Sequence, residues 1–293
     1  MDFNVTLISP EGYRFAYLLT DTCRFAAYGL RSLGHRCDLT VNTIETGKTN
    51  IIVGAHLVRP AEAEGIVRAG APYVVVQSEW LAPGAAPGQI VSSFHGERFE
   101  AECRLLFERA QAIWEAYDWN AGMLRAWHVP PERIKPYRTI GYHEKMRDVE
   151  HRPWDEKDID LLFFGSVTPR RQQVLEAVAR RRRRVVAVLD APAEFRNDLI
   201  ARAKLNLNVN ADERYPHLSL GRVGYLLNNR CALVSERATT HHEVQALVEC
   251  APYEQLADTC ERLLAGGRLA ELADDSYQRF QALPMTDELR RVL

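Results

Sequence analysis

The stretch KLNLNVNADERYPHLSLGRVGYLLNNRCALVSE, residues 204–236, predicts a strand, a loop, a helix and a second strand in succession. Apolar residues alternate over 205–209, which indicates a short strand. We expect an apolar helix from about His217 to Leu227 and a second buried strand over 231–234. Repeated units of strand, helix and strand are typical of a parallel sheet that helices cover on both faces.

Arg222 is the unusual residue of this predicted helix, because its neighbours along the helix are mostly apolar. A guanidinium group in such surroundings needs an anionic partner. In a parallel sheet the carboxyl ends of the strands and the amino ends of the helices face one crevice, which suits a phosphate group. The alternative is a core arginine that pairs with Glu236 or with a carboxylate of another domain.

Length and composition place the chain among globular proteins. Its 293 residues are enough for two compact domains, and 46% hydrophobic with 26% charged residues is an ordinary soluble composition. A net charge of -2 gives no global electrostatic reason to expect nucleic acid or an anionic membrane as partner.

Cysteine usage and hydropathy indicate a cytoplasmic protein. The six cysteines are scattered without a C-x-x-C pair, and the chain opens on a predicted strand rather than a secretory signal. This pattern favours reduced thiols over a disulfide framework or a zinc site. No apolar stretch is long enough to span a bilayer, so we expect no integral membrane association.

Strands alternate with helices in both halves of the chain, which predicts an α/β fold with two Rossmann-like domains. The almost wholly charged segment 143–158 lacks apolar periodicity, and we interpret it as the linker. We therefore expect an N-terminal domain over 1–145 and a C-terminal domain over 156–293. The tail 287–293 could pack back on the first domain.

A second signal lies where the predicted strand 159–164 meets the next predicted helix. Gly165 would let a ligand approach the backbone, and Ser166 or Thr168 can cap the helix or bind an oxygen atom. The sequence has neither a P-loop nor a G-x-G-x-x-G motif after its first strand. A phosphate site here would therefore belong to neither of those two classes.

Arg170 and Arg171 would stand in the first turn of this helix. The helix dipole disfavours cations there unless an anion is bound, so the two arginines suggest an anion site. The alternative is that both guanidinium groups are simply solvated.

Three residues of the first half follow predicted strands and could act as a general base: His56, Glu79 and Asp118. Histidine or a carboxylate can accept a proton from a hydroxyl near neutral pH. A purely structural role is the alternative for each. The sequence His-His-Glu at 241–243 makes no metal site, because adjacent helical side chains diverge by about 100°. We predict no metal site.

Taken together, these segments resemble GT-B glycosyltransferases, in particular the glycosyltransferase group 1-like set. The most specific likeness is R-V-x-Y-L-L-x-N followed by V-S-E within 222–236. Weaker likenesses occur in NIIVGAHLV, YVVVQSEWL, IKPYRTIGY, DIDLLFFGSVTPRRQQVL, LNLNVN and APYEQLADTCERLL.

The resemblance implies two Rossmann-like domains that face each other across a cleft, with the donor on the second domain and the acceptor on the first. It places His56 and Glu79 as candidate catalytic residues on the acceptor side. Relatives often carry glutamate three residues before the helix arginine, where this chain has Ser219. The candidate donor-binding residues are Gly165, Ser166, Arg170, Arg171, His217, Ser219, Arg222 and Glu236.

The implied reaction is glycosyl transfer from a nucleoside diphosphate sugar to an acceptor hydroxyl, without a metal or other cofactor. The acceptor could be a glycan, a small molecule or a modified DNA base, as for some phage enzymes. One alternative is a non-catalytic nucleotide-sugar-binding protein of the same fold. Another is an oxidoreductase that uses a different nucleotide, which the missing glycine fingerprint disfavours.

Overall fold

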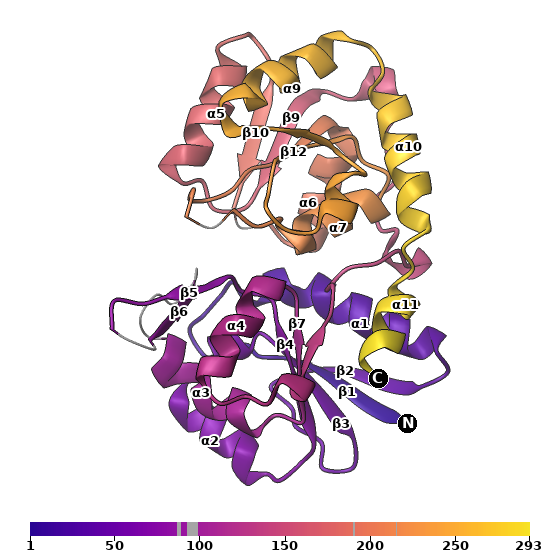
Figure 1. Ribbon diagram of the computed structural model, residues 1–293. Helices are drawn as coiled ribbons and strands as arrows, with labels where there is room; N and C mark the ends of the chain where they lie inside the picture. Colours follow the sequence, from indigo (N-terminus) through magenta and orange to yellow (C-terminus); the bar gives the residue numbers. More distant parts are fainter. Residues whose placement is uncertain (87–88, 93–98, 190, 215) are drawn as a thin grey trace. The chain divides into compact units, whose positions relative to one another are not determined.

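The chain forms two α/β units, each built around its own parallel sheet (Figure 1). The first unit contains Met1–Gly141 and Met285–Leu293, and the second contains Tyr142–Pro284. This architecture confirms the predicted fold class. The computed structural model describes residues 1–86, 89–92, 99–189, 191–214 and 216–293.

The sheet of the first unit has the strand order β2-β1-β3-β4-β7-β8, and all its strand pairs are parallel. Its central strands are buried along their length, as the apolar runs in their sequences require. The strands are β1 (Asp2–Leu7), β2 (Arg36–Val41), β3 (Thr49–Val53), β4 (Tyr73–Gln77), β7 (Ala112–Glu115) and β8 (Ile134–Pro136); β5 (Leu81–Pro83) and β6 (Ile90–Ser92) form a separate antiparallel pair.

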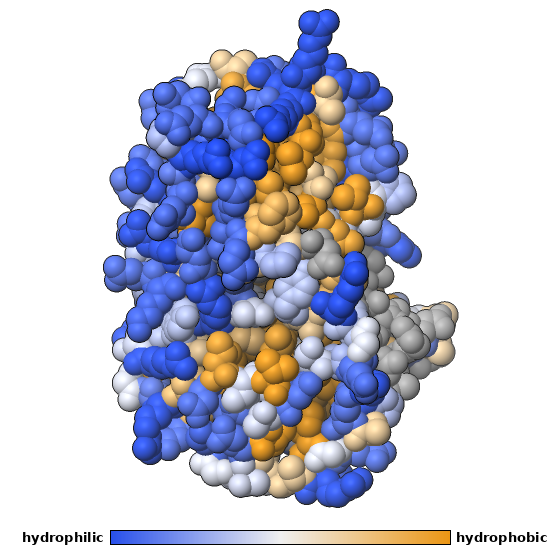
Figure 2. All heavy atoms as spheres, turned by 180° about the vertical axis from the view of Figure 1, so that it is seen from behind, coloured by the Kyte–Doolittle hydropathy of each residue, from blue (hydrophilic) through white to orange (hydrophobic). Residues whose placement is uncertain are grey.

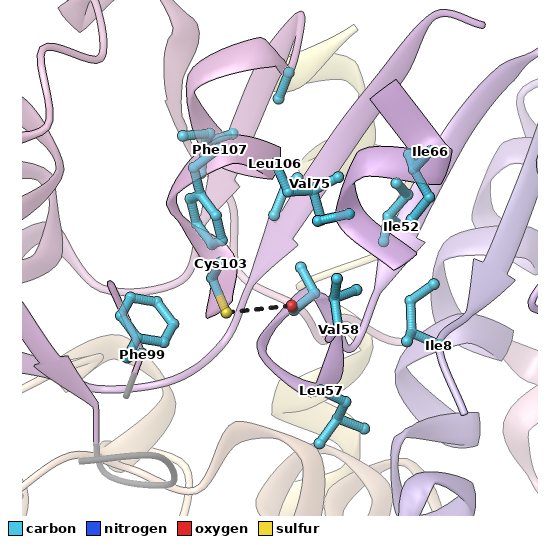
Figure 3. Close-up of a cluster of buried hydrophobic side chains, with 14 of the residues drawn as sticks. Ile8, Ile52, Leu57, Val58, Ile66, Val75, Phe99, Cys103, Leu106 and Phe107 are labelled. Atoms are coloured by element: carbon cyan, nitrogen blue, oxygen red, sulfur yellow. Dashed lines mark hydrogen bonds between the residues drawn. The ribbon is translucent and has the colours of Figure 1, made fainter. Parts of the chain in front are cut away.

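Helices α2 and α3 pack together on this sheet (Figure 1). Figure 3 shows their apolar side chains meeting those of β3 and β4, for example Ile66 with Ile52. Cys103 Sγ on α3 donates a hydrogen bond to Ala55 O at 3.5 Å, which ties the short helix η2 to this core. The helices are η1 (Ala16–Leu19), α1 (Thr20–Ser32), η2 (Ala55–Leu57), α2 (Pro60–Arg68), α3 (Phe99–Arg109), α4 (Asp118–Ala126), η3 (Pro131–Arg133) and α11 (Met285–Val292).

The C-terminal helix α11 belongs to the first unit, so the second unit ends at Pro284 rather than at residue 293. Gly29 on α1 lets this helix approach closely, because a Cβ at Gly29 would lie 2.5 Å from Leu289 Cδ1. Arg138 and Glu288 form a buried ion pair at 2.6 Å in the same unit. Burial of the apolar face of α11 holds the tail in the first unit. The ion pair fixes its position, because separating the two residues would leave an unpaired buried charge.

The sheet of the second unit has the order β10-β9-β11-β12-β13 and is also wholly parallel. Its core includes Leu161, Phe163, Leu207 and Val234. The elements are η4 (Glu144–Met146), η5 (Trp154–Glu156), β9 (Ile159–Phe164), α5 (Pro169–Ala179), β10 (Val185–Val188), α6 (Ala193–Arg202), β11 (Ala203–Asn208), α7 (Leu220–Asn228), β12 (Leu233–Glu236), α8 (His242–Gln245), β13 (Glu249–Ala251), η6 (Tyr253–Gln255), α9 (Leu256–Ala265) and α10 (Leu269–Gln281).

The charged segment 143–158 packs on the second unit. Buried Asn229 accepts hydrogen bonds from Asp148 N at 2.7 Å and Val149 N at 3.0 Å. Lys157 is also buried and donates to Ala201 O at 2.6 Å. Hydrogen bonds to backbone and side-chain amide groups therefore hold this segment. The hydropathy of the segment does not predict these bonds.

In both sheets the chain adds its second strand on one side of the first strand and its third strand on the other side. In each sheet the first strand lies between the second and the third, at β1/β3 in one unit and at β9/β11 in the other. In open parallel sheets, ligands bind outside the carboxyl ends of the strands at such a switch point. The switch points are therefore where functional side chains should be sought.

The helices and the surface combine polar and apolar residues. Within the described part of the chain, no helix combines the length and the apolar character needed to cross a bilayer. Figure 2 shows one face on which polar side chains predominate and apolar ones gather in patches.

Candidate functional site

Gly165 follows β9 with φ +136°, a conformation that favours glycine. A Cβ at this position would lie 2.5 Å from Nη2 of Arg222. Gly165 thus makes room for the guanidinium group of Arg222, whereas the sequence suggested room for a ligand. The nearby Thr168 is the N-cap of α5 and accepts a hydrogen bond from Arg171 N at 3.4 Å.

Arg222 extends from α7 to the carboxyl ends of β9 and β11. Its Nε donates to Phe164 O at 2.9 Å, and its Nη1 donates to Asn208 Oδ1 at 2.7 Å. The guanidinium carbon lies 4.9 Å from the centre of the Phe163 ring. A backbone oxygen, an amide oxygen and an aromatic face therefore orient this cation.

Arg171 reaches the same place from the first turn of α5. Its Nε donates to Val209 O at 2.9 Å, and its Nη1 donates to Ser166 O at 2.8 Å and Ser166 Oγ at 3.1 Å. It also lies over Phe163, with the guanidinium carbon 5.2 Å from the ring centre. Arg171 and Arg222 thus share one aromatic ring, and we call these two residues the arginine pair.

The arginine pair has no carboxylate within hydrogen-bonding distance among the described residues. Burial, and to a smaller extent the charge of Arg171, lowers the pKa of Arg222 to about 9. Burial likewise lowers the pKa of Arg171 to about 10, although the charge of Glu236 opposes this effect. Both groups remain cations near neutral pH.

The two arginines differ in how far solvent reaches them. Arg171 is buried, whereas Arg222 as a whole residue is only half-buried and keeps some accessible surface. Since desolvated charges are normally compensated, the site is electrostatically suited to an anion.

Glu236, at the end of β12, pairs with Arg170 and not with Arg222. Arg170 donates to both carboxylate oxygens, at 2.7 and 2.5 Å, and lies 3.7 Å from the centre of the Tyr253 ring. Asn210 N also donates to Glu236 at 2.8 Å. The alternative of an Arg222–Glu236 ion pair is therefore wrong, because a closer arginine takes the carboxylate.

Helix α7 begins at Leu220, three residues after the predicted start at His217. Ser219 is its N-cap, but the hydroxyl group makes no capping hydrogen bond. The loop that carries His217 is held by a bond from Thr239 N to Pro216 O at 2.9 Å. His217 and Ser219 thus stand at the amino end of the helix that supplies Arg222.

In the first unit, the structure brings His56 and Glu79 together. His56 lies in η2 after β3, Glu79 follows β4, and His56 Nε2 is 3.7 Å from Glu79 Oε1. The His56 side chain is 4% exposed and that of Glu79 is 20% exposed. Glu79 is therefore the member of this histidine–carboxylate pair that a substrate can reach.

Asn120 positions the Glu79 segment, and sequence reasoning missed it. Its Nδ2 donates to Glu79 O at 2.7 Å and to Glu115 Oε1 at 2.8 Å, and its Oδ1 accepts from Leu81 N at 2.9 Å. Asp118, the third candidate base, is exposed in the first turn of α4. The sequence signal for Asn120 is a polar residue on the buried face of an amphipathic helix, four residues before buried Leu124.

Glu115, at the end of β7, is a second residue that sequence reasoning missed. It is 3% exposed, and its Oε2 has no hydrogen-bond partner among the residues described. Burial raises the pKa of this carboxyl group well above its usual range, although bonds from Tyr117 N and Asn120 oppose the effect. A protonated carboxyl group at this position can support the Asn120 network without introducing charge.

Asn208, which holds Arg222, was also missed, and its position in the sequence contained a signal. Asn206 and Asn208 alternate with the apolar residues of β11 and are buried on the other face of the strand. Asparagine at buried positions of a parallel strand is uncommon, because both faces are usually apolar.

Within the described ranges, no group of three or more histidine, cysteine or acidic residues could hold a metal ion.

The solved structures that are similar to the whole chain at low sequence identity include the following three. Anabaena HepE (Alr3699) in complex with UDP has a TM-score of 0.60 at 11% identity, over 99% of this chain and 98% of that chain. T4 phage BGT in complex with its UDP-glucose substrate has a TM-score of 0.59 at 10% identity, over 100% and 97%. A candidate UDP-N-acetylglucosamine 2-epimerase from Listeria monocytogenes has a TM-score of 0.55 at 11% identity, over 100% and 95%.

No protein-family model matches the sequence, and no curated protein matches it. The structural similarity extends over nearly the whole of each chain, so it concerns both units and not a shared sheet alone. The chain therefore has the GT-B fold, which the sequence resemblance implied.

Proposed function

We propose that this protein transfers a glycosyl group from a nucleoside diphosphate sugar to an acceptor hydroxyl, without a divalent cation. The observation that carries the proposal is the arginine pair, Arg171 and Arg222, which lies at a switch point with no carboxylate partner among the described residues. A diphosphate supplies the missing negative charge, and the planar guanidinium fork suits its oxygens.

The same pair can contribute to catalysis. As the bond from the sugar to the diphosphate breaks, negative charge builds on the leaving group, and preoriented cations stabilise that charge where it develops. The amino end of α7, where Ser219 makes no capping hydrogen bond, offers backbone N–H groups to the same anion.

HepE and T4 phage BGT support a uridine nucleotide as the donor, because their structures hold UDP or UDP-glucose. We therefore choose UDP-glucose as the first donor to test. The choice of glucose as the donor sugar is part of the proposal. Melting curves with UDP-glucose and with UDP show whether the glucose contributes to binding.

On the acceptor side, we assign the general base to Glu79 and a positioning role to His56. In an inverting reaction the acceptor hydroxyl gives its proton to the Glu79 carboxylate as its oxygen bonds to the anomeric carbon, and the diphosphate leaves with the bonding electrons. His56 is nearly buried, so it can orient Glu79 but offers a substrate little surface.

A second candidate function is the isomerisation of a nucleotide sugar, which the similarity to the Listeria monocytogenes protein favours. Incubation with UDP-glucose in the presence of candidate acceptors, such as lactose, cellobiose and maltose, separates the two. Transfer or hydrolysis releases UDP, whereas isomerisation changes the sugar and leaves it attached to UDP. A stoichiometric complex with unchanged UDP-glucose would instead indicate a non-catalytic binding protein.

The decisive experiment compares melting curves with and without saturating UDP or UDP-glucose for the parent, Arg222→Lys and Arg181→Lys. Ligand at a hundred times its dissociation constant adds about 2.7 kcal/mol of stability. Arg222→Lys keeps the charge but loses the planar fork and its bonds to Phe164 O and Asn208. It should therefore melt below the parent and also lose most of the UDP-induced shift. Arg181 is the matched control, because it pairs with Asp258 on the surface of the same unit.

Two outcomes would contradict the proposal. One is a parent protein that neither UDP nor UDP-glucose stabilises. The other is an unliganded Arg222→Lys variant that is already destabilised while its folded fraction binds UDP normally. For the metal-independent step, chelation with EDTA should leave the release of UDP unchanged, and activity restored only by magnesium or manganese would disprove it.

A further inference from the structure

Trp119, in the first turn of α4, is a large apolar side chain that is 52% exposed. Its indole Nε1 donates a hydrogen bond to Leu81 O at 2.9 Å, so the orientation of the ring is fixed. Trp80 stacks parallel to it, with ring centres 6.2 Å apart and an interplanar angle of 2°. Trp119 is thus a fixed aromatic ring with a large solvent-accessible area.

Hydrogen bonds hold this ring to the backbone segment that carries the candidate base. The neighbouring residue Asn120 bonds Glu79 O and Leu81 N, so the segment 79–81 and the start of α4 are held together. Helix α4 follows the carboxyl end of β7, and Glu79 follows the adjacent strand β4. Trp119 and the histidine–carboxylate pair therefore share one edge of the first sheet.

We propose that Trp119 is an acceptor platform for a saccharide, whose ring stacks on the indole and presents a hydroxyl group to Glu79. The proposal rests on the proposed function and names its acceptor class. Exposed tryptophan supplies a large, rigid contact area at little cost in side-chain entropy. The side-chain entropy that Trp119 would lose on binding a saccharide is smaller still, because Leu81 and Trp80 already hold the ring.

The local charge favours a neutral sugar over a nucleic acid. Glu79 precedes the segment that binds the indole, and Asp118 adjoins Trp119 in the chain. Carboxylates at both places repel the phosphate groups of DNA or RNA, whereas nucleic-acid sites normally carry lysine and arginine. A saccharide brings hydroxyl groups, which donate hydrogen bonds to carboxylate oxygens.

The test uses protein labelled with 5-fluorotryptophan and followed by fluorine NMR. Trp119→Phe assigns the resonance of Trp119, and Trp154, which is exposed in the second unit, provides an internal reference. The probes are lactose, cellobiose and maltose, with thymidine and a short DNA duplex for comparison. We expect at least one disaccharide to move the Trp119 resonance saturably while the Trp154 resonance stays in place.

Trp119→Ala should weaken binding of that disaccharide about three- to tenfold and leave the UDP-induced melting shift unchanged. Trp119→Phe keeps a planar ring and should lose less, which covers the case of an unstable alanine variant. A Trp119 resonance that no disaccharide moves, or that only thymidine or DNA moves, would overturn the inference.

The two proposals fail in different ways. If UDP stabilises the protein and Trp119 does not respond to disaccharides, the acceptor inference alone is wrong. If Trp119 binds a disaccharide but UDP binds nowhere, the saccharide platform stands and glycosyl transfer is the part that fails.

Discussion

The two switch points of this protein have the same backbone topology but carry different ionisable groups. At β9/β11 of the second unit, Arg171 and Arg222 form a largely desolvated cationic pair over Phe163. At β1/β3 of the first unit, His56 contacts the carboxylate of Glu79, which follows the next strand. One site suits an anion, and the other suits a group that gives up a proton.

This difference shows which part of a parallel α/β unit decides its chemistry. The sheet determines where the loops meet, because its strand order creates the same crevice in both units. The residues just after the strands determine the charge of that crevice. Glycine follows a switch-point strand in both cases, with φ +84° at Gly54 and +136° at Gly165, but the side chains beyond it differ.

The largest effect that would separate the two sites is expected from Glu79→Gln. Loss of a general base should lower the transfer rate about 10²- to 10⁴-fold while the UDP-induced melting shift is kept. Steady-state kinetics and melting curves on the same sample measure both quantities. Glu132→Gln, at an exposed carboxylate of the same unit, is the control, and equal losses in the two variants would refute the role of Glu79.

The next largest effect is expected from alanine at the two glycines. Gly165→Ala forces a Cβ against Arg222 Nη2 in a strained conformation, so it should cost about 1–3 kcal/mol and abolish the UDP-induced shift. In Gly54→Ala the Cβ would lie 3.3 Å from Ile8 O, which should lower stability but spare UDP binding. Thermal melts with and without UDP decide this, and loss of UDP binding in both variants would contradict the separation of roles.

A smaller effect should distinguish the neighbouring arginines of α5. Arg171→Met removes one member of the arginine pair and should weaken UDP binding about tenfold, or roughly 1.4 kcal/mol. Arg170→Met removes the partner of Glu236 and should act mainly on stability, by about 1–3 kcal/mol. Titration calorimetry with UDP measures the difference. If both variants lose UDP to the same extent, Arg170 contacts the donor as directly as Arg171 does.

The smallest effect concerns pH and Glu115. Because burial raises its pKa in the folded protein, Glu115 favours folding below its unfolded-state pKa, and this contribution is lost as pH rises toward the folded-state value. Glu115→Gln should therefore match the parent near pH 4 and exceed its stability by about 1 kcal/mol near pH 8. Urea unfolding at the two pH values checks this. An equal difference at both would show that ionisation of Glu115 is not involved.

Much of the architecture could be predicted from the sequence, because strands and helices leave local periodic patterns. The alternation over 205–209 corresponds to part of β11, and the apolar run around Arg222 corresponds to α7. The sequence also predicted that His56 and Glu79 follow strands. These features depend on neighbours in the chain, which the sequence records directly.

The pairing of charges was decided only by the tertiary structure. Arg170, Arg171 and Arg222 all come from helices at one sheet edge, and only the folded geometry gives Glu236 to Arg170. Contacts between distant segments likewise join His56 to Glu79 and return α11 to the first unit. Composition showed the charge of segment 143–158 but not the amide of Asn229 that holds it. Such partners are set by distance in space, and a sequence records order along the chain.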